Sequence, residues 1–265
     1  MLSTNGTEFT APVVWIALVM GLLIGSFLTV VIDRVPRGVS IVRPGSSCGN
    51  CGLELGPLDL VPVFSWIALR GKCRACRSVI GVETIVVEIA AALLFVAMAL
   101  RFGDGFSTAA FCVFAAGLIA LTTIDLETQR LPREITYTVM ALGAPLLSIA
   151  AASNDEPRRM YMALIGAAIS WAVMALLYVA SRGGLGDGDV RLSPLLGLYL
   201  GWLNPGLALV GLFFGFILGA VVGVAMMVAG KAGRRTQLPF GPFLAAGSLV
   251  AIFVGQDFVD IVLGH

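Results

Sequence analysis

Two aspartates stand where long apolar stretches of the chain meet polar segments. Asp125 follows the apolar run 107–124 and begins a segment that reads Asp-Leu-Glu-Thr-Gln-Arg-Leu-Pro, and Asp189 ends the sequence Gly-Asp-Gly-Asp that starts at Gly186. A carboxylate beside hydrocarbon is energetically unfavourable, so it usually has a function. Two carboxylates at the same membrane face can share a proton and activate a water molecule. The pair therefore predicts acid–base chemistry on water.

Neighbouring carboxylates compete for both roles. Asp187 lies two residues before Asp189, and Glu127 lies two residues after Asp125. Spacing alone does not choose within either pair. Each aspartate could also be a solvated residue at a helix end that pairs with a nearby arginine or caps the next helix. The residues by themselves therefore leave these assignments open.

Four further residues are candidates for supporting roles. Gly186 and Gly188 allow positive φ angles, which would let the backbone bring the second aspartate close to a neighbouring helix. Arg191 supplies a cation two residues after that aspartate. Glu88 lies about one turn inside the apolar run 84–100, where a carboxylate needs a polar partner or a water-filled cavity.

Four cysteines form two C-x-x-C pairs, Cys48 with Cys51 and Cys73 with Cys76, separated by 21 residues. This spacing is typical of a tetrahedral, structural zinc site. Segment 33–83, which contains the pairs, is too short to build a large core, so a metal would stabilise it. The alternatives are redox-active or unligated thiols and, less favoured, a catalytic metal.

The composition is that of a membrane protein. The 265 residues are 58% hydrophobic and 12% charged, with a mean hydropathy of +0.96, whereas a soluble domain carries about 25% charged residues. We expect an all-α polytopic membrane protein with about eight transmembrane helices. The predicted spans are 12–32, 84–100, 107–124, 135–152, 160–181, 192–202, 206–230 and 240–263. The sixth is short, so it is either re-entrant or begins inside the glycine-rich loop.

The distribution of basic residues predicts the orientation. Segments 33–83, 125–134, 182–191 and 231–239 carry every lysine and arginine except Arg101, Arg158 and Arg159. Basic loops face the cytoplasm, so both aspartates are expected at the cytoplasmic boundary and both termini outside. No basic run is interleaved with aromatic residues, and we expect no nucleic-acid partner.

Glycines recur every four residues in the seventh predicted span, at positions 211, 215, 219 and 223, and Gly21 and Gly25 have the same spacing in the first. Small residues at this spacing let two helices approach closely. We therefore predict helix–helix contacts at both glycine faces. The single histidine, His265, excludes a Ser-His-Asp triad and a histidine-rich metal site.

In their order and spacing, these motifs resemble the type IV prepilin peptidase family of G-x-G-D intramembrane aspartic proteases. The resemblance covers nearly the whole chain. It rests on 25–31, 34–38, 40–42, the two C-x-x-C pairs, 59–63, Ser65-Trp66, 69–73, Val87-Glu88, Ile124-Asp125, Leu131-Pro132 and Gly186-x-Gly188-Asp189 with 190–192. The sequence departs from the family at Thr29, where Asn is common, at Arg191, where Lys is usual, and at Arg133, where Asp is common.

The resemblance implies that Asp125 and Asp189, rather than Glu127 and Asp187, form the catalytic dyad. It also implies cleavage of type IV prepilins or pseudopilins, which carry a short basic leader before a hydrophobic helix, at the cytoplasmic face of the bacterial inner membrane. Relatives with the cysteine-bearing segment often also methylate the new N-terminus with S-adenosylmethionine. The resemblance thus divides the chain into an outer tail with the first span (1–32), a four-cysteine module (33–83) and a peptidase domain (84–265).

Three other functions remain as alternatives. A protease similar to presenilin or signal peptide peptidase would also use G-x-G-D, but those families have Tyr before the first aspartate, where this chain has Ile124. A proton-coupled transporter would place its aspartates near the membrane midplane. A zinc-bearing scaffold would leave the aspartates without a catalytic role.

Overall fold

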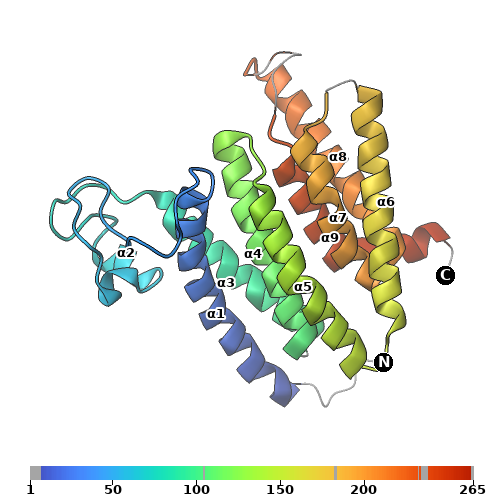
Figure 1. The fold of residues 1–265 in the computed structure, drawn as a ribbon, viewed down its shortest axis with the longest axis horizontal. Coiled ribbons are helices and arrows are strands. Elements are labelled where there is room, and N and C mark those ends of the chain that lie inside the picture. Colours follow the sequence, from blue (N-terminus) through green and yellow to red (C-terminus); the bar gives the residue numbers. More distant parts are fainter. Residues whose placement is uncertain (1–6, 104, 182–183, 232, 234–237, 264–265) are drawn as a thin grey trace. The chain divides into compact units, whose positions relative to one another are not determined.

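In a computed structural model of the chain, residues 7–103, 105–181, 184–231, 233 and 238–263 are described. The long helices are α1 (Thr7–Arg34), α3 (Val82–Phe102), α4 (Gly105–Thr128), α5 (Arg133–Ser153), α6 (Arg158–Ser181), α7 (Asp187–Leu203), α8 (Pro205–Val228) and α9 (Gly241–Leu263) (Figure 1). The described residues contain no extended strand, so the predicted all-α class is confirmed. The chain divides into two compact units, Met1–Ala120 and Leu121–His265, and each is considered separately.

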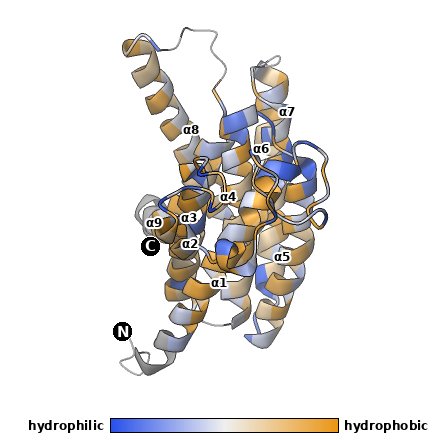
Figure 2. Ribbon diagram, turned by 90° about the vertical axis from the view of Figure 1, so that its left-hand side faces the viewer, coloured by the Kyte–Doolittle hydropathy of each residue, from blue (hydrophilic) through white to orange (hydrophobic). Residues whose placement is uncertain are grey.

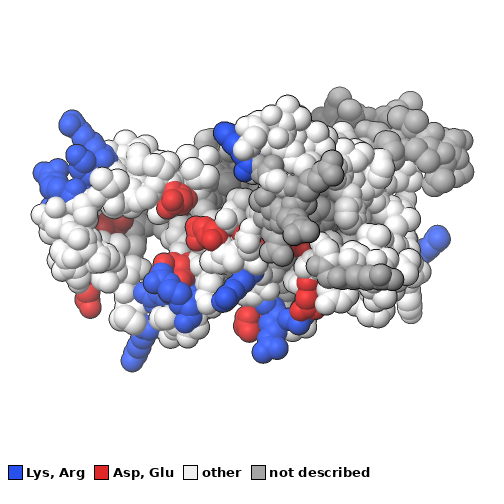
Figure 3. Space-filling model, turned by 90° about the horizontal axis from the view of Figure 1, so that it is seen from above, with Lys and Arg blue, Asp and Glu red and all other residues white. Residues whose placement is uncertain are grey.

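Within the described residues, six helices are long and apolar enough to cross a membrane: α1 from Pro12 onward, α3, α4, α5, α6 and α8. Hydrophobic residues predominate along the helices, whereas hydrophilic residues concentrate in the connecting segments (Figure 2). Uncharged residues make up most of the surface visible in Figure 3, and charged residues form small groups on it. The chain is therefore a multi-pass membrane protein.

Each of the eight predicted spans coincides with a helix, but eight spans are not established. Helix α7 has only 17 residues, and in α9 the apolar segment found among the described side chains is 241–255. Asp189, which precedes the predicted span 192–202, lies in the first turn of α7. Helix α7 begins earlier than the predicted span 192–202, because acidic residues in a first turn are favoured by the helix dipole and Gly186 takes the N-cap position. The prediction that this helix starts inside the glycine-rich segment is confirmed.

In the first unit, α1 and α3 pack through the glycines of α1. A side chain at Gly21 would lie 2.6 Å from the Cα atom of Ala92, and one at Gly25 would lie 2.7 Å from the Cα atom of Glu88. Only glycine allows this approach, so the predicted helix contact is confirmed. The segment between the two helices holds the short 3-10 helix η1 (Pro57–Leu60) and helix α2 (Phe64–Ala68).

In the second unit, glycines again set the helix packing. A side chain at Gly166 of α6 would overlap the carbonyl oxygen of Gly197 in α7. Gly215 and Gly219 of α8 closely approach the start of α9, and Gly211 lies against Leu200 of α7 as well as α9, which confirms the predicted helix contacts for these three glycines. Among the described residues, Gly223 has only Leu238, before α9, near it. The interior of this unit holds the most buried stretch of α7, 195–202. Close packing on α6 and α8 fixes α7, whose first turn carries Asp189.

The predicted segments 1–32, 33–83 and 84–265 remain predictions. Some sequence-based assignments concern residues outside the described ranges. These are the basic residues Arg182, Arg234 and Arg235 and the histidine His265.

Candidate active site and metal centre

Asp125 lies in the last turn of α4 and is 5% exposed. The backbone N–H of Gly241, the first residue of α9, donates a hydrogen bond of 2.9 Å to its Oδ2 atom. After the helix ends, Gln129 adopts a positive φ of 53°, which turns the chain toward Leu131. Asp125 is therefore a buried carboxylate held by the beginning of another helix.

Asp189 lies in the first turn of α7 and is also 5% exposed. A side chain at Gly186 would lie 2.9 Å from its Oδ2 atom, so the glycine leaves room for the carboxylate beside the helix start. The two carboxylates, Asp125 and Asp189, are close enough to interact electrostatically. The structure thus brings together two acidic groups that are 64 residues apart in the sequence.

The competing carboxylates lie in different surroundings. Asp187 is exposed and forms an ion pair with Arg191, one turn further along α7. Glu127 is exposed at the end of α4. Burial therefore separates Asp125 and Asp189 from their neighbours in sequence. Arg191, one of the candidate supporting residues, lies in a surface ion pair with Asp187.

Sequence reasoning missed Gly241 as part of this site. A side chain there would lie 2.8 Å from Oδ2 of Asp125 and 3.1 Å from Leu131. Leu131 also contacts Gly188, where an added Cβ atom would lie 3.0 Å from its own Cβ. The sequence feature that could have indicated this glycine is Phe240-Gly241-Pro242, at the start of the last apolar run. Leu131 therefore fills the space between the starts of α7 and α9. Its side chain leaves no room for a Cβ atom at Gly188 or Gly241.

The four cysteines of the first unit form one cluster. Cys48, Cys51, Cys73 and Cys76 place their sulfur atoms within 4.8 Å of one another. A tetrahedral zinc ion with Zn–S bonds of about 2.3 Å separates its sulfurs by about 3.8 Å. The sulfurs of Cys48 and Cys76 are 3.7 Å apart. The donor set and its dimensions therefore fit a zinc ion, as the C-x-x-C spacing predicts.

Polar contacts hold this module together. Asp59 accepts a hydrogen bond of 2.8 Å from the N–H of Gly56 and forms an ion pair with Arg74 between two of the cysteines. Isolated bridges join Ser47 to Glu54 and Lys72 to Val79, one around each C-x-x-C pair. Each pair thus lies in its own tight turn, which presents its two sulfurs to the other pair.

Glu88 connects the module to the membrane helices. It is 3% exposed, and its Oε2 atom accepts a hydrogen bond of 2.7 Å from the N–H of Val63, the N-cap of α2. Val63 has a φ of 62°, a conformation that a β-branched residue rarely adopts. The polar partner expected for Glu88 is therefore a backbone group of the cysteine module.

Comparison with known proteins identifies two matching family models. The bacterial peptidase A24 N-terminal domain matches residues 19–102, and the type IV leader peptidase family matches residues 112–224. No solved structure matches.

Several curated relatives, described as prepilin leader peptidase/N-methyltransferase, align with most of the chain. The Bacillus subtilis protein is 31% identical over 94% of this chain and 97% of its own length. The Stutzerimonas stutzeri protein is 32% identical over 91% and 90%. The Pseudomonas aeruginosa protein is 31% identical over 93% and 92%. Because both family models match in order and these relatives align over almost their full length, the chain belongs to the type IV leader peptidase family.

Proposed function

We propose that this protein is a membrane endopeptidase that removes the short basic leader of type IV prepilins or pseudopilins. The observation that carries the proposal is the pair of buried carboxylates, Asp125 and Asp189. Their neighbours in sequence, Glu127 and Asp187, are exposed. The names of the relatives, prepilin leader peptidase/N-methyltransferase, supply the substrate class.

The dyad would hydrolyse the peptide bond by acid–base catalysis. One carboxylate, in its ionised form, takes a proton from a water molecule as the water oxygen attacks the scissile carbonyl carbon. The other, in its protonated form, donates its proton to the carbonyl oxygen. The first carboxylate, now protonated, gives its proton to the amine of the leaving peptide as the C–N bond breaks, and the second recovers a proton from a hydroxyl group of the tetrahedral intermediate. Since the two groups interact, they titrate as a pair.

The Gly241 N–H would fix the rotamer of Asp125 during this cycle. Its hydrogen bond occupies one lone pair of Oδ2 and leaves Oδ1 for water or the partner carboxylate. Both aspartates lie at helix ends, so a leader could approach from the aqueous side while the hydrophobic helix of the substrate stays in the bilayer. The basic loops support a cytoplasmic orientation of this end, with both termini outside, in the inner membrane of a bacterium.

A zinc ion bound by Cys48, Cys51, Cys73 and Cys76 would be structural. Four sulfurs complete a tetrahedral site and leave no position for water, so the ion would stabilise the module and take no part in hydrolysis. The hydroxyl of Ser78, 3.1 Å from the sulfur of Cys76 and 3.5 Å from that of Cys48, would orient these two ligands.

A second activity, methylation of the new N-terminal amine with S-adenosylmethionine, is favoured by the names of the relatives. When bound, this cofactor would supply a methyl group to an uncharged amine. Among the described residues, no group of side chains identifies where it would bind, so the proposal for this activity rests on similarity.

The test is cleavage of a prepilin by purified protein in liposomes. We expect Asp125→Asn and Asp189→Asn each to lower kcat by at least about a thousandfold, because each removes one partner of the acid–base pair. Asp187→Asn is the matched control, since it removes a carboxylate from the same helix turn but only from a surface ion pair. Full activity of either dyad variant would contradict the proposed site.

A further inference from the structure

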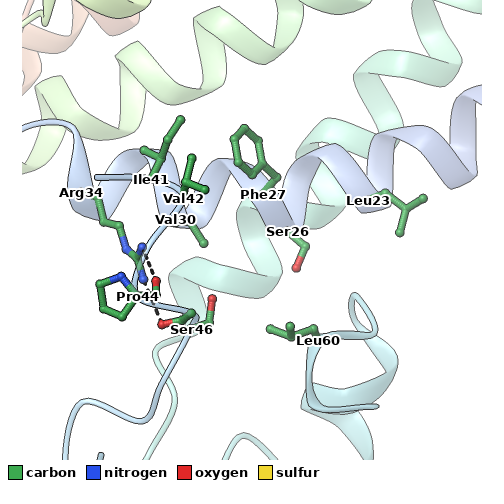
Figure 4. Close-up of a pocket in the computed structure, with 11 residues that line it drawn as sticks. Leu23, Ser26, Phe27, Val30, Arg34, Ile41, Val42, Pro44, Ser46 and Leu60 are labelled. Carbon is green, nitrogen blue, oxygen red and sulfur yellow. Dashed lines mark hydrogen bonds between the residues drawn. The ribbon is translucent and has the colours of Figure 1, made fainter. Parts of the chain in front are cut away.

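A groove runs along one face of α1 in the first unit (Figure 4). Its floor is formed by Leu23, Ser26, Phe27, Val30 and Arg34, which recur at helical spacing. Its other wall consists of Leu60 of η1 and five residues of the segment that follows α1, namely Ile41, Val42, Pro44, Gly45 and Ser46. The groove therefore lies between a membrane-spanning helix and the cysteine module.

The dimensions of the groove restrict what it can hold. From Leu23 to Arg34, α1 rises by about 16 Å, which is roughly half of the hydrocarbon thickness of a bilayer. The volume is about 320 Å³. Spread over that length, this volume gives a mean cross-section of about 20 Å², which suits a slender chain and is much smaller than the cross-section of an α-helix.

The groove is open to the apolar surroundings of α1. Leu23 is 52% exposed, Phe27 is 46% exposed and Leu60 is 43% exposed. Leu23 and Phe27 belong to a helix that is apolar enough to span the membrane, so their exposed surface is continuous with the surface that contacts lipid. The wall formed by Leu60 therefore borders the hydrocarbon of one leaflet.

The end of the groove at Arg34 is basic. The guanidinium of Arg34 donates hydrogen bonds to the carbonyl oxygens of Ser40, Pro44 and Gly45, at 3.0, 2.8 and 3.2 Å. These bonds use three of its five N–H groups and hold segment 40–45 against the helix end. Arg43, in the same segment, is exposed and forms no ion pair with any described carboxylate. The groove thus combines an apolar length of one leaflet with Arg34 at one end, and Arg43 lies between the lining residues Val42 and Pro44 in the sequence.

We propose that this groove binds one phospholipid, with an acyl chain along α1 and the phosphate at Arg34 and Arg43. The chain lies between Leu23 and Leu60, and the remaining N–H groups of Arg34 face the phosphate together with Arg43. A bound lipid of this kind fills the space between α1 and the cysteine module, so the lipid joins the module to the membrane-spanning part of the unit.

Two other occupants fit less well. An α-helix is about 10 Å wide with its side chains, so its cross-section is roughly four times that of the groove. The hydrophobic helix of a prepilin would therefore need the wall to move away. Nucleoside cofactors commonly hold their ribose with a carboxylate, and the lining of the groove contains no acidic side chain. The groove is thus not assigned to S-adenosylmethionine.

The test is native mass spectrometry of delipidated protein in detergent, titrated with dioleoyl phosphatidylglycerol. We expect one lipid per chain to remain bound. Ser26→Phe places a ring in the groove and displaces two or more methylenes of the chain, which should weaken binding by about tenfold or more. Val19→Phe is the matched control, since Val19 is an exposed residue of α1 that does not line the groove.

Two further variants and two competition experiments separate the sources of binding. Arg43→Gln should weaken lipid binding, and Ser46→Leu should reproduce the effect of Ser26→Phe from the opposite wall if the latter variant fails to fold. Glycerophosphoglycerol, the headgroup without chains, should not compete with the lipid. The proposal is overturned if both groove-filling variants bind lipid like the wild type. It is also overturned if the headgroup alone competes, or if a peptide with the prepilin hydrophobic segment displaces the lipid at equal concentration.

Discussion

The backbone N–H of Gly241 donates a 2.9 Å hydrogen bond to the carboxylate of Asp125, which lies 116 residues earlier in the chain. This bond links the end of α4 to the start of α9. Because the N–H points along the axis of α9, the positive end of that helix also faces the carboxylate. The last helix of the chain therefore orients one member of the proposed dyad.

Replacing Gly241 by alanine should impair catalysis more than folding. The added Cβ atom would lie 2.8 Å from Oδ2 of Asp125, so the carboxylate must shift. A displacement of this kind can lower kcat by about a hundredfold. Prepilin cleavage measures the effect, and Gly105→Ala is the control, because a side chain at Gly105 enters open space in a helix. Equal activity of the two variants would exclude the orienting role.

The cysteine cluster should retain about one zinc ion per chain after purification. Cys73→Ser, at the buried cysteine, should lower the metal content and expose segment 33–83 to trypsin, because its fold depends on the ion. Cys112→Ser is the control, since this buried cysteine belongs to α4. Metal analysis and limited proteolysis give the readouts. Metal retained by Cys73→Ser, or lost by Cys112→Ser, would contradict the assigned ligands.

Zinc binding should weaken as the pH falls from about 7 to about 5. A hydrogen bond from the Ser78 hydroxyl lowers the pKa of Cys76 to about 5 and that of Cys48 to about 7. Both thiols are thus more readily ionised than free cysteine, and protonation of these two ligands competes with the metal as the pH approaches these values. Ser78→Ala raises both pKa values and should shift the pH of metal loss upward. An unchanged midpoint in a chelator competition would contradict this role.

Glu88→Ala should destabilise the first unit by about 1–3 kcal/mol, because it leaves the N–H of Val63 without its acceptor. Glu88→Gln retains an acceptor oxygen and should have a smaller effect. Val63→Gly should be tolerated, since glycine adopts the positive φ of this position without strain. Thermal unfolding in detergent measures all three. If Glu88→Ala and Glu88→Gln were both as stable as the wild type, the hydrogen bond would not hold the module.

Gly197→Ala should destabilise the second unit and reduce cleavage together. Its Cβ atom would overlap the carbonyl oxygen of Gly166, so α6 and α7 must separate. Overpacking of this kind typically costs about 1–3 kcal/mol, and the separation would also move the first turn of α7 with Asp189. The melting temperature and kcat should fall in parallel. Loss of kcat at an unchanged melting temperature would point to a different cause.

The sequence by itself determined the class of the protein and the chemistry available to it. Its apolar runs predicted helices at all eight positions, since helix formation in a membrane follows from length and hydrophobicity. The spacing of the cysteines predicted their cluster, because two tight turns suffice to bring four sulfurs together. The glycine repeats predicted close helix contacts for the same local reason.

The tertiary structure decided which groups act together. The spacing in the sequence does not show whether Asp187 or Asp189 belongs to the dyad. Burial in the second unit distinguishes Asp189 from Asp187, which is exposed and paired with Arg191. The contacts of Asp125 with Gly241 and of Glu88 with Val63 join residues far apart in the chain. Such contacts depend on how helices pack, and packing is a property of all their side chains together, so no local pattern encodes them.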